Sequence, residues 1–130
     1  MEKVVVDSDV LIDLLRNEPD TAALIKSLET THELGTTDIN AFELYWGAYK
    51  SRKMESEVTA AKGLLNTLFL LGTNEAAMEL SAKIISDLER QGNPTDLRDL
   101  FIASICIVHS LKLLTRNRKH FEKIRGLKLV

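Results

Sequence analysis

The sequence is poor in the residues that build disulfide-rich, zinc-clustered or membrane proteins. Its only cysteine is Cys106, which excludes an internal disulfide and a cysteine zinc cluster; we interpret Cys106 as a small buried hydrophobic residue. The longest uncharged apolar stretch, residues 100–110, is far shorter than the roughly 20 residues that a membrane span needs. The N-terminus lacks the pattern of a signal peptide. We therefore expect a cytoplasmic protein with no membrane segment.

Several catalytic patterns are missing as well. No glycine-rich loop is present that could cradle a nucleotide. The three histidines, at positions 32, 109 and 120, are scattered, so no pair of them has the spacing of zinc ligands. Neither a Ser-His-Asp nor a Cys-His arrangement is recognisable. The chemistry must therefore come from other residues.

The remaining composition is that of an ordinary globular protein, with 45% hydrophobic and 28% charged residues and no internal repeat or linker. The net charge of −2 hides two opposite ends. Residues 1–43 carry ten acidic and three basic residues, whereas residues 112–128 carry seven basic residues and one acidic residue. A binder of long duplex DNA would usually be basic overall. An acidic front and a basic tail suit a metal site beside a rim that contacts phosphates, although two solvated faces that never meet would have the same composition.

Apolar residues alternate between strand-like and helix-like spacing along the chain. This pattern predicts strands at 4–6, around 34, and at 69–71, 111–115 and 127–130. It predicts helices at 10–15, 19–28, from 39 through 49, and at 58–68, 75–89, 97–111 and around 120. Strands that alternate with helices pair in parallel through right-handed crossovers. The predicted fold is an α/β protein, a three-layer α/β/α sandwich whose mainly parallel central sheet has about five strands.

Three acidic residues lie where such a fold binds its ligands, near the carboxyl ends of the strands. Asp7 follows the three valines of the first strand, Glu43 lies on or beside the inward face of its helix, and Asp99 opens a buried helix. Each has an alternative explanation: a helix N-cap for Asp7, a buried arginine partner for Glu43, and a favourable helix-dipole charge for Asp99. Asp96, three residues earlier, is the better cap of that last helix, which leaves Asp99 for the site.

Carboxylates a few ångströms apart repel one another and raise one another's pKa unless a divalent cation neutralises them. An all-oxygen set of ligands favours Mg²⁺ or Mn²⁺ over zinc. Such an ion keeps water molecules, one of which can attack a phosphorus atom. The acids therefore indicate metal-assisted hydrolysis of a phosphodiester. Thr115, Arg116 and Asn117 add hydrogen-bonding side chains after the fourth strand.

Four stretches together resemble a known family. They are Val-Val-Val-Asp7-Ser-Asp-Val-Leu-Ile-Asp, Thr37-Asp-Ile-Asn-Ala-Phe-Glu43-Leu, Asp99-Leu-Phe-Ile-Ala-Ser, and Leu-Leu-Thr115-Arg-Asn117 with Phe121 after it. In order and spacing they resemble the PIN-domain ribonucleases, in particular the VapC-like toxins of prokaryotic toxin-antitoxin pairs. The resemblance covers essentially all 130 residues, so it implies one PIN-like nuclease domain over residues 1–130.

The resemblance implies a Mg²⁺- or Mn²⁺-dependent endoribonuclease that cleaves single-stranded or structured RNA. The metal-binding acids of the family fall on Asp7, Glu43 and Asp99, and its fourth catalytic position falls on Asn117. An amide there removes one negative charge, so we expect one ion in the resting state. Ser8, Thr115 and Arg116 are assigned to substrate binding, with the hydroxyl of Thr115 also supporting the site.

The resemblance also implies a homodimer and a small antitoxin that covers the acidic groove with a basic side chain. Apolar residues of the predicted helices independently indicate an interface, because one small core is not expected to absorb them all. They are Phe42, Trp46 and Tyr49, with Leu11, Leu14, Leu15, Leu24 and Leu28.

Two alternatives stay open on sequence alone. Asp7 and Asp9 fit the Asp-x-Asp start of haloacid-dehalogenase-like phosphatases, with Thr115 as their second motif, although the closing acidic motif of that family is missing. An inactive protein-binding α/β module would need none of these acids to converge. Titration with Mn²⁺ separates this module from a nuclease, because a module without the site should show no saturable, carboxylate-dependent binding.

Overall fold

The computed structural model describes residues 1–130 as four strands and seven helices. The strands are β1 (Glu2–Val6), β2 (His32–Thr37), β3 (Phe69–Leu71) and β4 (Lys112–Leu114). The helices are α1 (Ser8–Leu15), α2 (Pro19–Leu28), α3 (Asp38–Tyr49), α4 (Met54–Leu65), α5 (Glu75–Arg90), α6 (Leu97–Val108) and α7 (Arg118–Glu122). None of these helices is both long and apolar enough to cross a bilayer.

The four strands form one parallel sheet in the order β3-β2-β1-β4. The predicted fifth strand at 127–130 is wrong as a full strand. Leu129 makes only an isolated parallel bridge with Leu113, flanked by the two hydrogen bonds from Leu113 N to Lys128 O and from Val130 N to Leu113 O. The central position of β1 places the residue that follows it in the middle of the carboxyl edge of the sheet.

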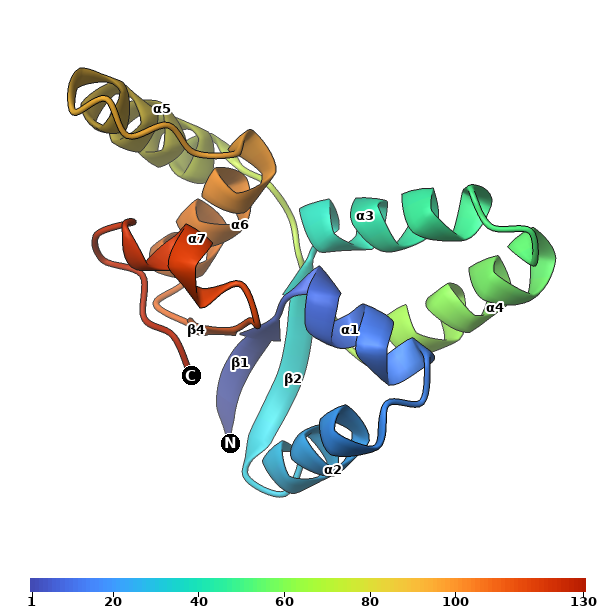
Figure 1. The fold of residues 1–130 in the computed structure, drawn as a ribbon. Coiled ribbons are helices and arrows are strands. Elements are labelled where there is room, and N and C mark those ends of the chain that lie inside the picture. The colour runs from blue at the N-terminus through green and yellow to red at the C-terminus, as the bar shows by residue number, and fades with distance from the viewer.

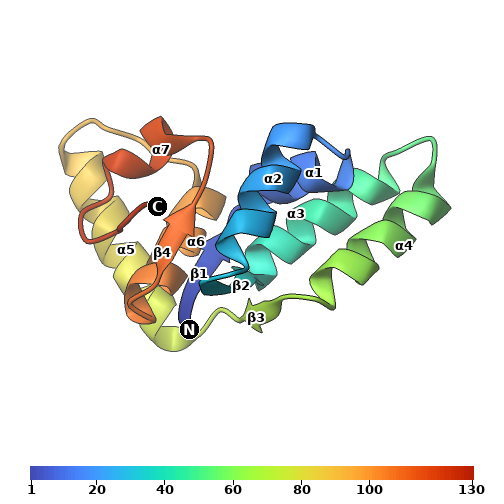
Figure 2. The same cartoon turned by 90° about the horizontal axis from the view of Figure 1, so that it is seen from below.

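Helices cover both faces of the sheet, as the predicted three-layer sandwich requires (Figure 1, Figure 2). Successive residues of β1 point to opposite faces, so Val4 and Val6 belong to one core cluster and Val5 to the other. The first cluster packs against α1–α4 and the second against α5–α7. Because β1 is buried from both sides, the residue that follows it, Asp7, is buried as well.

The helix boundaries follow local signals with two exceptions. Thr37 caps α3 through a capping box with Asn40, and the side chains of Asn74 and Asp96 cap α5 and α6. Helix α6 ends at Val108, three residues before the predicted end, because Ser110 adopts a positive φ of 56° that closes a C-terminal turn. Helix α4 begins at Met54, in a charged turn that precedes its apolar residues.

The core absorbs half of the apolar residues that were expected at an interface. Cys106 is fully buried, as predicted, and burial raises the pKa of its thiol to about 12. Leu11 is buried, and Leu14, Leu15 and Leu28 pack against the same core cluster. Leu24 remains exposed, as do the three aromatic residues of α3, namely Phe42, Trp46 and Tyr49.

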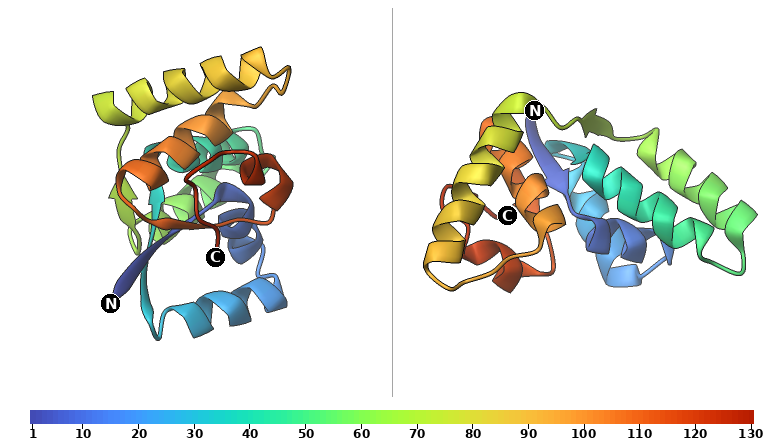
Figure 3. Two further views of the ribbon diagram at one scale, coloured as in Figure 1. Left: turned by 90° about the vertical axis from the view of Figure 1, so that its left-hand side faces the viewer. Right: turned by 90° about the horizontal axis from the view of Figure 1, so that it is seen from above.

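Helices α3 and α4 pack side by side and project from the sheet as a helical hairpin (Figure 3). Helix α1 lies across the base of this hairpin and contacts both of its helices. The hairpin therefore extends the molecule to one side of the sheet, and its first helix begins at the carboxyl end of β2, next to Asp7.

The close packing of β2 against β3 allows a test of the sheet. A Cβ atom on Gly35 would overlap the ring of Phe69, its neighbour in the strand register. We expect Gly35→Ala to lower the free energy of unfolding by about 1–3 kcal/mol. Phe69→Leu in the same chain should recover part of this loss, because a smaller side chain leaves room for the methyl group. Unfolding in urea measures both.

Gly63→Ala is the matched control, because no atom lies within 4 Å of the position that its Cβ would take on α4. This substitution should stabilise the protein by up to about 1 kcal/mol through its helix propensity. A Gly35→Ala variant as stable as the wild type would contradict the packing of Phe69 over β2.

Candidate active site

The candidate site lies where the chain leaves β1 and β4, two neighbouring parallel strands. Asp7 follows β1, and its backbone N–H donates to the carbonyl of Leu114 at the end of β4 over 2.9 Å. Thr115 follows β4 directly. Beyond β1 the chain turns toward β2, whereas β4 lies on the opposite side of β1, so the strand order reverses here. Such switch points are the usual ligand sites of parallel α/β sheets.

Asp7 is a buried carboxylate, only 5% exposed, held by three donors from three parts of the chain. Its Oδ1 accepts from Ser8 N over 2.8 Å and from Asn40 Nδ2 over 2.9 Å, and its Oδ2 accepts from Thr115 Oγ1 over 2.7 Å. No basic side chain forms an ion pair with it. Burial, with the nearby charges of Asp9 and Glu43, raises its pKa to about 6 against the hydrogen bonds that lower it.

Ser8 and Asn40 connect Asp7 to Glu43. Asn40 Nδ2 donates to Ser8 Oγ over 2.8 Å as well as to Asp7, and Ser8 Oγ donates to Glu43 Oε1 over 2.8 Å. Burial raises the pKa of Glu43, and Asp99 and Asp96 add to this, while Ser8 and Arg98 lower it. The amide of Asn40 and the hydroxyl of Ser8 thus join the predicted metal-binding acid after β1 to the one on α3.

Asp99 lies on the first turn of α6, close enough to Glu43 for its charge to raise the pKa of Glu43. Burial, together with the charge of Asp96, raises the pKa of Asp99 itself. His120 of α7 is its partner, with Nδ1 3.3 Å from Oδ2 of Asp99. Asp96 caps the helix, as predicted, by accepting from the backbone N–H of Arg98 over 2.8 Å.

Asn40, Arg98 and His120 belong to the site although sequence reasoning did not select them. Asn40 is completely buried, and its Oδ1 accepts from the hydroxyl of Thr37 over 2.7 Å. The spacing Thr37-x-x-Asn40 is that of a capping box, and Asn40 precedes Glu43 by three residues on one helix face. That signal could have identified Asn40. No local pattern marks Arg98 or His120, because their contacts arise between α6, α3 and α7.

The residues assigned to the substrate make other contacts in this structure. The hydroxyl of Ser8 donates a hydrogen bond to Glu43, and the hydroxyl of Thr115 donates one to Asp7. Arg116 places its guanidinium against Asp13, at 2.9 Å, and against the hydroxyl of Thr21, while its backbone N–H donates to Asp9 Oδ2 over 3.0 Å. Asn117 is exposed at the start of α7 and its side chain makes no hydrogen bond.

In this structure the acids do not form a finished cage, since no three His, Cys, Asp or Glu side chains surround one point closely enough to hold a metal ion. The donors nevertheless fit a hard divalent cation. They are oxygens of carboxylates whose pKa values are raised by burial and by one another, and Asp7 has no cationic partner. A divalent cation is the species that would compensate this charge.

The raised pKa of Asp7 predicts how stability depends on pH. Between the ordinary value of 3.8 and the folded value of about 6, the folded chain binds more protons than the unfolded chain. The free energy of unfolding of the metal-free protein should therefore fall as the pH rises through this window, by at most about 3 kcal/mol from Asp7. Asp7→Asn should flatten that part of the curve. Urea unfolding in EDTA from pH 4 to pH 7.5 measures it, and equal slopes in both proteins would contradict the assignment.

Comparisons of the sequence and of the structure with known proteins find matches in the same family. The sequence model of the PIN domain matches residues 4–127. The chain is 27% identical to the tRNA(fMet)-specific endonuclease VapC of Shigella flexneri, over 98% of this chain and 96% of the relative. It is 30% identical to ribonuclease VapC1 of Methanocaldococcus jannaschii, over 98% of this chain and 86% of the relative.

Among solved structures, DNA-bound VapBC from Salmonella typhimurium contains a chain of the same fold. The TM-score is 0.89 at 27% identity, with 100% of this chain and 98% of that chain covered. Agreement over the whole length, in order and in architecture, leaves no part of the described fold outside the match. The chain therefore belongs to the PIN-domain family and, within it, to the VapC ribonucleases of toxin-antitoxin pairs.

Proposed function

We propose that the protein cleaves RNA by hydrolysis at the acidic site of Asp7, Glu43 and Asp99, with Mg²⁺ or Mn²⁺ as cofactor. The observation that carries the proposal is Asp7, a 5% exposed carboxylate with no basic partner at the strand switch point of a PIN ribonuclease. A buried, unpaired carboxylate costs stability unless another cation compensates it. Its presence without a basic partner at this position supports a role in binding a metal.

Asp7, Glu43 and Asp99 would hold the metal. When bound, the ion would supply a water nucleophile near neutral pH and neutralise charge on the phosphate oxygens. The hydroxyls of Ser8 and Thr115 then act as positioning groups, because each donates a hydrogen bond to one of the acids. Such donors keep a carboxylate ionised and oriented, and their loss typically costs about 10- to 100-fold in metal affinity or activity.

Membership of the ribonuclease family decides against the haloacid-dehalogenase-like alternative. In the structure Asp9, the second acid of that motif, accepts from the backbone N–H groups of Val10 and Arg116 over 2.7 and 3.0 Å. These bonds hold α1 against the loop after β4, which is a structural role. The inactive-module alternative predicts acids that serve only as caps and ion pairs. Asp7 does cap α1 by accepting from Ser8 N, but it also accepts hydrogen bonds from Asn40 and Thr115 and has no ion-pair partner.

Substitution of the acids tests the site. Asp7→Asn, Glu43→Gln and Asp99→Asn should each abolish cleavage of mixed RNA at saturating Mg²⁺ and leave the fold intact, because each removes one charged ligand. Asp87→Asn is the control, since Asp87 pairs with Arg90 on the exposed face of α5. Gel analysis of the products should show 5′-phosphate and 3′-hydroxyl ends.

Near wild-type activity in any one of the three variants would remove that residue from the site. Cyclic 2′,3′-phosphate ends formed in EDTA would point to a metal-independent mechanism and contradict the proposal as a whole. Because Asp87→Asn also removes one surface charge, a general effect of net charge on RNA binding would appear in the control.

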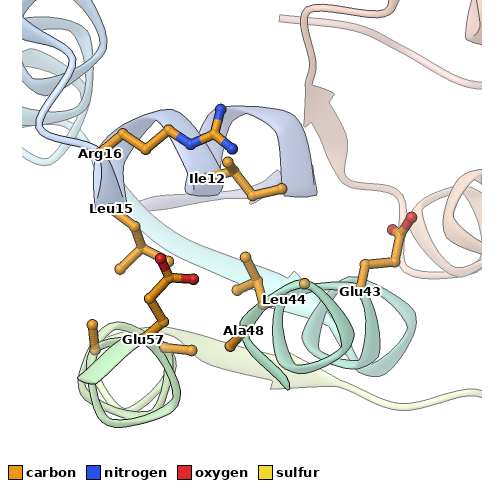
Figure 4. A pocket seen from close by; sticks show the side chains of 10 residues that line it. Ile12, Leu15, Arg16, Glu43, Leu44, Ala48 and Glu57 are labelled. Atoms are coloured by element: carbon orange, nitrogen blue, oxygen red, sulfur yellow. The ribbon is translucent and has the colours of Figure 1, made fainter. Parts of the chain in front are cut away.

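A groove of about 180 Å³ beside Glu43 suits a small protein partner (Figure 4). Side chains of α1, α3 and α4 line it, and most of them are apolar, including Ile12, Leu15 and Leu44. Glu43 lies at one end of this groove. An apolar peptide segment that carries an arginine would match this arrangement, because the planar guanidinium satisfies two carboxylates at once. We therefore assign the groove to the antitoxin.

The exposed aromatic residues of α3 support a homodimer. Phe42 and Trp46 stack with their ring centroids 5.7 Å apart and are about half exposed, and Tyr49 is 58% exposed one turn further on. A face of this kind on a projecting helix is typical of an interface. With the core absorbing most leucines of α1 and α2, we place the dimer contact on α3, such that the two acidic sites open into one groove.

Two measurements check these partners. Sedimentation at micromolar concentration should show a dimer, and Tyr49→Lys should shift it toward monomer without unfolding; a wild-type monomer would overturn the dimer.

A short basic-tailed protein from the neighbouring gene should suppress RNA cleavage on mixing. Ala60→Glu, at an exposed groove position, should weaken that suppression while cleavage by the free nuclease persists. Suppression equal to that of the wild type would place the antitoxin elsewhere.

A further inference from the structure

Arg98 is a cation within the acidic site itself. It lies on the first turn of α6, directly before Asp99, and its guanidinium is 3.7 Å from Glu43 Oε2 and 3.6 Å from Asp96 Oδ1. The guanidinium also lies over the ring of Trp46, 5.5 Å from its centroid. Both distances to the acids are those of loose ion pairs, longer than a charge-assisted hydrogen bond.

Three other arginines of the chain are more firmly engaged. The guanidinium of Arg116 contacts both Asp13 and Thr21, that of Arg118 donates to the carbonyl of Val130 over 2.8 Å, and that of Arg90 donates to Asp87 over 3.0 Å. The side chain of Arg98 makes no hydrogen bond and is 43% exposed. Its five N–H donors are therefore available to a ligand.

Neutralisation of Glu43 does not explain why an arginine lies at this position. The arginine lowers the pKa of Glu43, but burial outweighs it, and the pKa of that carboxyl stays raised. An ion pair this exposed and this long contributes little to stability. The Trp46 ring instead keeps the guanidinium beside the acids, and the ammonium of Lys50 lies over the same ring, 4.4 Å from its centroid. Two cations thus lie over the ring of Trp46, one turn of α3 after Glu43, beside a site whose substrate is a polyanion.

We propose that Arg98 binds a phosphate of the RNA next to the one that is cleaved. The proposal rests on the proposed RNA hydrolysis at Asp7, Glu43 and Asp99. A planar guanidinium with free donors recognises a phosphate through two parallel hydrogen bonds. A phosphate at this position would replace the loose ion pairs with Glu43 and Asp96, leaving those carboxylates free. Trp46 would act as the platform that holds the guanidinium in place.

The test uses a short single-stranded RNA that the protein cleaves at one position. Arg98→Met keeps the aliphatic stem and should raise KM about tenfold with kcat within about twofold, because one charged contact is lost in binding. The dependence of log KM on log salt should decrease by about one phosphate contact. Arg90→Met, an exposed arginine of α5, is the matched control and should change neither quantity.

A neutral methylphosphonate moved along the RNA, one linkage at a time, identifies the phosphate. At one linkage next to the cleavage position, the methylphosphonate should raise the KM of the wild type. The same substitution should not raise the KM of Arg98→Met any further. The KM of Arg98→Lys should rise less than that of the wild type. Equal effects of every linkage in both proteins, or an unchanged KM in Arg98→Met, would overturn the proposal. A wild type that cleaves no RNA would overturn the proposed function instead, so the two failures are distinguishable.

Discussion

A carboxylate that must be buried at the end of the central strand is the constraint on which the rest of the site depends. Helices pack on both faces of β1, so the side chain of Asp7 has almost no access to water. Its oxygens then need donors from the protein, and these come from Ser8 on α1, Asn40 on α3 and Thr115 after β4. One acid thereby determines how three other segments meet, because a misplaced donor would leave a buried charge unsatisfied.

The hydrogen bonds that hold Asp7 also position the second acid, Glu43. The side-chain N–H groups of Asn40 donate to Asp7 and Ser8, and its side-chain oxygen accepts from Thr37. The start of α3 is therefore oriented by the acid and by the helix cap together. Glu43 follows one turn later and is reached through the hydroxyl of Ser8. The hydrogen bonds lower the pKa of Asp7 but do not offset its burial. The metal-free fold therefore keeps a local instability at the site, which a bound cation would relieve.

Sequence reasoning succeeded where one local rule decides the outcome. Three valines followed by an aspartate place Asp7 at the mouth of a parallel sheet, and the cap at Asp96 was predicted from its position before a buried helix. It gave no indication of contacts that join distant elements. Arg116 follows β4 as expected, yet its long side chain reaches Asp13. The last predicted strand has the right composition, but whether it pairs over its length depends on the path of the chain after α7, which composition does not specify.

The two halves of the acidic site differ in rigidity, and this difference follows from their partners. Asp7 accepts short hydrogen bonds from backbone, amide and hydroxyl donors that are themselves buried. Glu43 and Asp99 are about one-fifth exposed and face the partly exposed, flexible side chains of Arg98 and His120 at 3.3 to 3.7 Å. Long, exposed ion pairs cost little to break. The buried half can therefore fix the position of a ligand, while the exposed half can exchange its present partners for a cation or a phosphate without disturbing the core. An acidic site built in this way would stay folded without a metal ion and would still adjust on binding a metal ion and RNA.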